Sequence, residues 1–151
     1  AVGELTLTNI SKKAQPLIRY RTADIVDIVD TDPCTCGRSS FRFHIKGRSD
    51  DMIVVGGINV FPSAVERICS EFLDQLNGEY QIVLKTPPPH ENLLLRAEYR
   101  SDLKEEKLKE LKSTLEKVCR NKIGFRPDIE LLHQGSLPRE DGKSRRVIKS
   151  Y

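Results

Sequence analysis

Short apolar runs rich in β-branched residues fill the first third of the chain, without a helical period. The runs "ELTLT" (residues 4–8) and "IVDIV" (25–29) each predict a strand, and "FRFHIKG" (41–47) alternates apolar and polar side chains as a strand does. The loop "DPCTCGRSS" (32–40) separates the second run from the third. About 45 residues of strand and loop make a poor domain on their own. We therefore expect residues 1–46 to belong to a larger body.

A hairpin and a helix are expected next. The stretch "MIVVGGINVFP" (52–62) holds two apolar runs joined by Gly56-Gly57, a dipeptide typical of a tight turn because both positions tolerate a positive φ. Pro62 suits the first position of a helix, which we expect to end near Asn77-Gly78. The apolar face of this helix is predicted to consist of Val65, Ile68, Cys69, Phe72, Leu73 and Leu76.

Two strands, a long helix and a further strand complete the pattern. The runs "YQIVLKT" (80–86) and "LLLRAEY" (93–99) flank a loop with three prolines and predict two antiparallel strands, and "PDIELLH" (127–133) predicts another strand. Asp102 and Glu105 have the spacing of a capping box at the start of the long helix. Its apolar stripe is Leu103, Leu108, Leu111, Leu115, Val118, Cys119 and Ile123.

The order hairpin, helix, strand, strand, helix, strand predicts an α+β domain over residues 53–134. We expect a small antiparallel sheet with the helices packed on one face. A loop with Lys143 and a short β-like run, "RRVIKS" (145–150), follow.

Charge and hydropathy exclude two classes of protein. Lys and Arg number 25 against 22 Asp and Glu, and a net charge of +3 is too small for a dedicated nucleic-acid binder. No apolar run approaches the roughly 18 residues of a membrane span, and the amino terminus has no signal-peptide pattern. A soluble, cytoplasmic protein with no nucleic-acid or membrane partner is predicted.

The four cysteines fall into two pairs. Cys69 and Cys119 lie on apolar helix faces, and we expect them to be buried reduced thiols. Cys34 and Cys36 share one loop, and their thiolates can supply half of a tetrahedral zinc shell. The missing zinc ligands would have to come from another domain, and a reduced pair that binds nothing within this chain is the alternative. The three histidines, His44, His90 and His133, suggest no cluster.

Three ordered stretches carry the candidate chemistry: "IRYRTADI" (18–25), "GRSDDMIVVGGINVFPSAVE" (47–66) and "PREDGKSRRV" (138–147). Together they resemble the carboxy-terminal portion of the adenylate-forming superfamily, and within it the phenylacetate-CoA ligase family. The likeness spans nearly the whole chain. The chain starts at Ala1 with no initiator methionine, and we expect it to be a piece of a longer protein.

The resemblance implies a domain organisation. In this family a large amino-terminal domain binds the acid and ATP, and a small carboxy-terminal cap swings over it. Residues 1–46 would then be the β-rich end of the large domain, residues 47–52 the hinge linker and residues 53–151 the α+β cap.

Roles for single residues follow from the same resemblance. Asp24 would accept hydrogen bonds from the ribose hydroxyls of the adenylate, Arg48 would approach the ribose or phosphate, and Asp50 would be the hinge. A turn aspartate and an Asp-rich surface turn are the plain structural alternatives. Gly56 and Gly57 would line the pantetheine tunnel besides turning the chain. The family usually has glycine where Ala23 stands, so the backbone there must tolerate a Cβ.

Lys143 occupies the position of the family's catalytic lysine, after "EDG" and before "SRRV". Adenylation brings a carboxylate to the α-phosphorus of ATP, and a mobile ammonium neutralises the developing negative charge. Arg145, with Arg146 and Lys149, would steer the CoA phosphates, although a basic tail is more often merely solvated.

The implied activity is that of an aryl- or arylacetyl-CoA ligase. ATP with Mg²⁺ would activate an aryl acid as its adenylate, CoA would displace AMP, and the piece alone would be inactive. An adenylate-forming enzyme with a non-CoA acceptor is the nearer alternative. The other is a stand-alone ferredoxin-like ligand- or RNA-binding module, although neither "QIVLKT" nor "DIELLH" has the aromatic pattern of an RNA-binding sheet.

Overall fold

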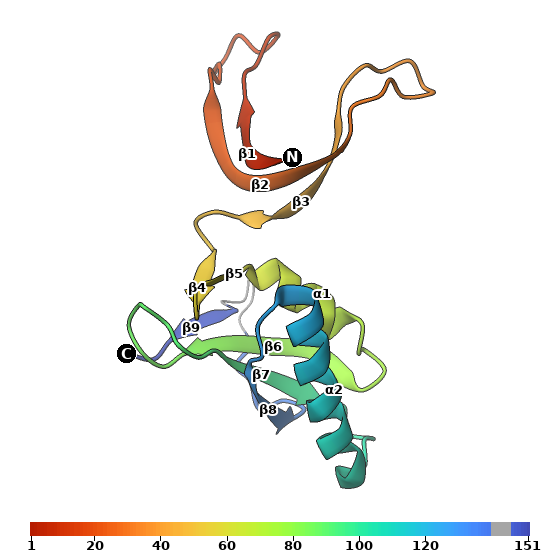
Figure 1. Ribbon diagram of the computed structural model, residues 1–151, viewed down its shortest axis with the longest axis vertical. Coiled ribbons are helices and arrows are strands. Elements are labelled where there is room, and N and C mark those ends of the chain that lie inside the picture. The colour runs from red at the N-terminus through yellow and green to blue at the C-terminus, as the bar shows by residue number, and fades with distance from the viewer. Residues whose placement is uncertain (140–145) are drawn as a thin grey trace. The chain divides into compact units, whose positions relative to one another are not determined.

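The computed structural model describes residues 1–139 and 146–151, and the chain divides into two compact units, Ala1–Met52 and Ile53–Tyr151 (Figure 1). The first unit is a three-stranded antiparallel sheet of β1 (Val2–Leu7), β2 (Tyr20–Asp30) and β3 (Arg42–Arg48), with β2 in the middle. The three strands predicted from the apolar runs are therefore present, and β2 begins earlier than its apolar run.

The first unit has almost no core of its own. Val26 is its one buried apolar side chain, whereas ten large apolar side chains are exposed: Val2, Leu7, Ile10, Leu17, Ile18, Tyr20, Val29, Phe41, Phe43 and Ile45. The unit therefore leaves these apolar side chains in contact with solvent.

The second unit contains the predicted α+β arrangement. A hairpin of β4 (Ile53–Val55) and β5 (Ile58–Val60) precedes α1 (Pro62–Ser70), and α2 (Glu105–Ile123) follows the first two strands of a four-stranded sheet. The strands of that sheet are β6 (Leu76–Leu84), β7 (Leu94–Tyr99), β8 (Asp128–His133) and β9 (Val147–Lys149), in the order β8-β7-β6-β9.

The sheet is mixed, and the prediction of an antiparallel sheet holds only for its central pair. β6 and β7 are antiparallel, whereas β8 joins β7 and β9 joins β6 in parallel. The direction of β8 follows from α2, because a helix between two neighbouring strands returns the chain to the end where the first strand began. β4 and β5 form a separate sheet, unlike the first strand of a ferredoxin-like module.

One apolar cluster joins the two helices to the sheet. Its sheet side includes Tyr80, Ile82, Leu84, Leu95 and Ala97, and its helix side includes Ile68, Cys69, Leu111, Leu115 and Cys119. The strand members alternate along the sequence, so they lie on one face of the sheet. Because α1 and α2 contact each other and share this cluster, the prediction of helices on one face is confirmed.

Two helix boundaries differ from the prediction. α1 ends at Ser70 and not near Asn77-Gly78, because residues 71–75 form turns closed by bonds such as Gln75 N to Phe72 O (2.9 Å). Leu76, expected on the helix, starts β6. The capping box is also absent, because Asp102 accepts from Arg100 Nε (3.2 Å) and Lys104 is the N-cap, without a side-chain cap.

The Gly56-Gly57 turn is as predicted. Gly56 has φ 55° and Gly57 has φ 78°, and Ile53 pairs with Val60 across the hairpin. Left-handed values at both central positions match the right-handed twist of the flanking strands. No helix among residues 1–139 and 146–151 has the length and apolar character that crossing a lipid bilayer requires.

Candidate functional site

The candidate site of the first unit lies where β2 and β3 run side by side. Asp24 and Arg48 are direct partners in the register of this pair, and an irregularity follows Ile25. Arg48 Nη1 lies 3.5 Å from Asp24 Oδ1 and donates to the carbonyl oxygen of Thr22 at 3.3 Å. The pairing of two strands therefore brings together residues that stand 24 positions apart in sequence.

Arg48 also holds the start of the segment that follows β3. Its Nε donates to Asp50 Oδ1 at 2.9 Å and its Nη2 to Asp50 Oδ2 at 2.7 Å, a two-bond fork, and Asp51 Oδ2 lies 3.9 Å from Nε. These hydrogen bonds from Arg48 hold the pKa of the Asp50 carboxyl below its usual value. Asp24, Arg48 and Asp50 thus form one cluster, which we call the Arg48 cluster.

The members of the Arg48 cluster are open to solvent. Their side chains are 30% (Asp24), 46% (Arg48) and 56% (Asp50) exposed. An exposed ion pair of this kind contributes little to stability. The cluster is therefore better suited to exchanging partners than to holding the fold.

Ala23 has a left-handed backbone, with φ 64°. Such a conformation is uncommon for a residue with a Cβ. Hydrogen bonds on both sides hold it: the Ala23 carbonyl accepts from Ser49 N at 2.7 Å, and its N–H donates to Glu4 Oε1 at 3.2 Å. The expectation that this backbone accommodates a Cβ is met, with strain that glycine would not have.

Glu4 and Thr22 support the site and were not predicted. The Glu4 carboxylate on β1 pairs with Arg21 and also accepts a hydrogen bond from the Ala23 amide. The Thr22 hydroxyl oxygen accepts a hydrogen bond from Asp24 N at 3.1 Å. Glu4 lies in a plain strand pattern, and no sequence signal distinguishes it. Thr22 lies inside the quoted motif "IRYRTADI" and was detectable as a hydroxyl two residues before an aspartate.

The Gly56-Gly57 turn belongs to the second unit. A Cβ at Gly56 would lie 3.8 Å from the Phe125 ring, and a Cβ at Gly57 would meet nothing within 4 Å. Gly56 N donates to the carbonyl oxygen of His90 at 2.9 Å, which fixes the turn to the β6–β7 loop. Gly57 therefore presents open backbone to solvent.

The predicted residues Lys143 and Arg145 lie outside the described residues. The described chain stops at Arg139 and resumes at Arg146. Arg146, proposed from sequence as a further phosphate contact, is instead engaged within the fold, because its Nη1 donates to Glu79 Oε2 at 2.7 Å.

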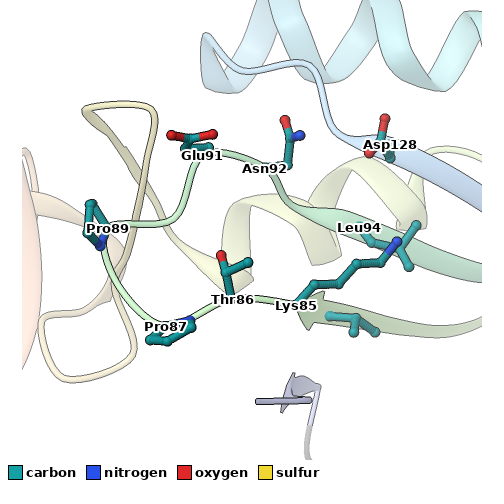
Figure 2. A pocket seen from close by; sticks show the side chains of 9 residues that line it. Lys85, Thr86, Pro87, Pro89, Glu91, Asn92, Leu94 and Asp128 are labelled. Carbon is teal, nitrogen blue, oxygen red and sulfur yellow. The ribbon is translucent and has the colours of Figure 1, made fainter.

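The loop between β6 and β7, which the Gly56 amide contacts, borders a hollow of about 470 Å³ (Figure 2). Its lining comes from this loop, the ends of the flanking strands and the start of β8: Val83, Lys85, Thr86, Pro87, Pro89, Glu91, Asn92, Leu94 and Asp128. None of the residues predicted to carry function lies in this lining.

Cys34 and Cys36 are free thiols, half-buried and exposed respectively. Hydrogen bonds from Cys36 lower the pKa of Cys34. The bond from the Cys36 backbone has the larger effect, and the bond from the Cys36 thiol adds to it. A thiol that ionises easily suits a metal ligand. Among the described residues, however, no group of three or more His, Cys, Asp and Glu side chains could hold a metal ion. The pair alone does not make a zinc site.

Cys69 and Cys119 behave in the opposite way. Both are buried in the core and free. Burial raises the pKa of Cys69 to about 12 and that of Cys119 to about 11. These two thiols therefore act as small apolar side chains, as predicted.

The chain is similar to known proteins over almost its whole length. Residues 57–150 match the AMP-binding enzyme C-terminal domain. The sequence is 32% identical over 149 residues to the phenylacetate-coenzyme A ligase of Escherichia coli (strain K12), covering 97% of this chain and 33% of that protein. The chain thus spans about a third of the length of this curated relative.

Two solved structures are similar to this one. A 2-hydroxyisobutyryl-CoA ligase, crystallised in the postadenylation state in complex with R3-HIB-AMP, has a TM-score of 0.85 and 28% identity, over 99% of this chain and 32% of that chain. A domain of the phenylacetate-coenzyme A ligase from Bacteroides vulgatus ATCC 8482 has a TM-score of 0.58 and 26% identity, over 66% of this chain and 92% of that chain.

Replacement of Ala23 by glycine is expected to raise the free energy of unfolding by about 0.5–1 kcal/mol, because it relieves the left-handed strain. Ala64→Gly in α1 is the matched control and should lower the free energy of unfolding by about 0.5–1 kcal/mol. Urea unfolding followed by circular dichroism measures both. A loss of stability in Ala23→Gly would contradict the assigned strain.

The Arg48→Gln variant is expected to raise the pKa of Asp50 towards its ordinary value of about 3.9. Because the folded pKa is lowered, the pair stabilises the folded state at neutral pH, and this effect is lost as the pH falls below about 4. Carboxyl carbon shifts followed by NMR titration report the change.

Arg42→Gln is the control for this titration. It removes the guanidinium that lowers the pKa of Asp30, so Asp30 should shift and Asp50 should not. An Asp50 pKa that is unchanged in Arg48→Gln would refute the pairing.

Proposed function

The chain belongs to the AMP-binding enzyme C-terminal domain family, and we propose that it forms the carboxy-terminal part of an AMP-forming acid-CoA ligase acting on an aryl or arylacetic acid. The observation that carries the proposal is the Arg48 cluster. Three residues singled out from motif positions meet at one exposed point of the first unit. Their chemistry suits a nucleotide at that point.

In this proposal Asp24 binds the adenylate ribose. An ionised carboxylate has two oxygens and accepts hydrogen bonds from two neighbouring hydroxyls. Asp24 contacts Arg48 only at 3.5 Å, so its oxygens are not committed to a tight pair. Arg48 lies beside it and supplies a guanidinium to the ribose or a phosphate oxygen.

Asp50 is proposed as the hinge of the linker 47–52. Support comes from its position, three residues before Ile53, where the second compact unit begins. Its carboxylate pairs with the exposed Arg48 and with nearby backbone amides, and it can leave these partners without exposing a core. The domains would then be residues 1–46, a part of the large domain, and residues 53–151, the cap.

Two half-reactions follow. With Lys143 in the site, a carboxylate oxygen of the acid attacks the α-phosphorus of ATP, the bond to the β-phosphate breaks, and pyrophosphate leaves. The Lys143 ammonium neutralises charge that develops between two anions. After the cap rotates, the CoA thiolate attacks the acyl carbon and AMP departs.

Mg²⁺ would shield the phosphates of ATP. No acidic cluster among the described residues is large enough to hold Mg²⁺ alone, so ATP itself and the rest of the enzyme would hold the ion.

The thioester-forming pose would use the hairpin. Gly57 exposes backbone on which a narrow pantetheine chain can lie, because no Cβ stands in the way. Gly56 holds the turn through its bond to His90, and Arg145 would contact a CoA phosphate.

The large domain of the same enzyme is the proposed partner of the first unit. The ten exposed apolar side chains there support a covering body of protein. Cys34 and Cys36 would be two of four zinc ligands if that body supplies the other two. Four free thiols support a reducing compartment such as the cytoplasm.

The Lys143→Ala change in the full-length enzyme is expected to slow adenylation by roughly 10²- to 10³-fold, the loss typical when one charge-stabilising donor is removed. Thioester formation from supplied acyl-adenylate should stay nearly intact. Exchange of pyrophosphate with ATP, assayed over a panel of aryl acids, measures the first step. Lys112→Ala removes an exposed lysine of α2 that has no proposed role, and it should leave both steps unchanged. Equal loss in both half-reactions would refute the role of Lys143.

The Asp50→Pro change is expected to impair one half-reaction far more than the other, because proline fixes φ at the hinge. Asp50→Ala is the control: it removes the carboxylate but leaves φ free, so any loss of rate should be similar in the two half-reactions. Single-turnover assays of each step separate them. Similar rates for both steps in Asp50→Pro would count against a rotating cap.

A further inference from the structure

We propose that Glu98 and Arg146 are positioning residues that hold the two ends of the segment carrying Lys143, so that adenylation depends on them. This inference rests on the proposed function, because it takes Lys143 as the lysine of that step. The residues that carry the argument all lie in the described part of the second unit.

Glu98 is a fully buried carboxylate on β7, with 0% of its surface exposed. Its Oε1 accepts from Leu137 N at 2.6 Å, and its Oε2 accepts from Gly135 N at 2.9 Å and from Asn77 Nδ2 at 2.5 Å. Two of these three donors are backbone amides of the chain that leads towards Lys143. A buried charge costs a great deal unless it is hydrogen-bonded in this way.

Hydrogen bonds favour the ionised form of the buried Glu98 carboxylate. Burial, the strongest single influence, raises its pKa, but the bonds from Leu137, Gly135 and Asn77 together outweigh it, so the pKa lies below its usual value. Charge-assisted hydrogen bonds are about twice as strong as neutral ones. The hydrogen bonds from Gly135 N and Leu137 N to Glu98 therefore hold residues 135–137 strongly.

Glu98 lies outside the apolar cluster beneath the helices. Its neighbours Ala97 and Tyr99 belong to the cluster under the helices, and strand alternation places Glu98 on the opposite face of the sheet. Glu130 on β8 lies on that same face, half-exposed, and pairs with Arg96 at 2.7 Å. Burial of Glu98 thus serves the loop that it bonds, and not the packing of the helices.

Arg146 fixes the other end. Its Nη1 donates to Glu79 Oε2 at 2.7 Å and to the Tyr80 carbonyl oxygen at 3.2 Å, and its guanidinium lies 4.7 Å from the centre of the Tyr80 ring. Its own carbonyl oxygen accepts from Ile82 N at 2.7 Å. The chain that returns from Lys143 is therefore attached to β6 by side chain and backbone.

The two attachment points belong to neighbouring strands, β7 for Glu98 and β6 for Arg146. Tyr80 pairs directly with Ala97, the neighbour of Glu98, in the register of β6 and β7. Residues 135–137 and Arg146 flank Lys143 in the sequence on either side. In catalysis generally, a misplacement of about 1 Å can cost 10²-fold in rate, so the positioning role rests on these two attachments.

The test uses the full-length enzyme with Glu98→Gln. One amide hydrogen would now face a backbone N–H, and the charge is lost. We expect kcat for adenylation to fall about 10- to 100-fold with KM for ATP little changed. Thioester formation from supplied acyl-adenylate should stay near wild type. Arg146→Gln, which loosens the other end, should give the same division between the two steps.

Glu130→Gln is the matched control, because it removes a carboxylate from the same sheet face without touching the loop. It should leave both half-reactions intact. Hydrogen exchange supplies a readout independent of catalysis: the amides of Gly135 and Leu137 should exchange faster in Glu98→Gln, while those of α2 do not.

The outcomes separate the two proposals. Faster exchange at Gly135 and Leu137 with unchanged adenylation overturns the positioning role and leaves the ligase assignment standing. Equal loss of both half-reactions, or exchange that rises throughout the unit, also overturns it, because a general loss of stability explains both. If Lys143→Ala itself shows no selective loss, it is the proposed function that fails.

Discussion

The second unit depends on removing one face of β6 and β7 from water beneath α1 and α2. Ile82, Leu95 and Leu115 lie at the centre of that contact and are almost wholly buried. Burial of apolar surface drives this packing. The opposite face is thereby free for other uses, and there a single carboxylate, Glu98, collects the backbone of the following loop. One face of the sheet therefore packs against the helices and stabilises the unit, whereas the other face holds the backbone of the loop through hydrogen bonds.

The candidate site of the first unit is organised differently, around a single arginine that pairs with several aspartates. Arg48 touches Asp24, Asp50 and Asp51, all at the surface, and its partners come from a strand and from the segment beyond it. Pairs of this kind are weak in water and exchange readily. The unit has little core of its own. Its geometry is therefore suited to a place where a ligand or a second body of protein completes the structure.

Local patterns predicted most of the elements, because strand alternation, the Gly56-Gly57 turn and Pro62 act over a few residues. Long-range effects account for the errors. The parallel pairing of β8 and β9 depends on how α2 and the last loop return the chain, and the early end of α1 depends on Leu76 being needed in a strand. Motif positions predicted Asp24, Arg48 and Asp50, and strand register brings them together. The roles of Glu4 and Glu98 were not predicted from the sequence, because a carboxylate in a strand gives no sequence signal of the partners that it binds in the fold.

The contrast between the two pairs of thiols has a practical side. Cys69 and Cys119 are shielded and reluctant to ionise, whereas Cys34 and Cys36 lie near the surface and the sulfur of Cys34 ionises more easily than a free thiol. A maleimide spin label or fluorophore at neutral pH would therefore attach to the "CTCG" loop without any cysteine being removed. The native thiols thus provide a labelling point on one unit, from which the distance to a second probe on the other unit can be measured in solution.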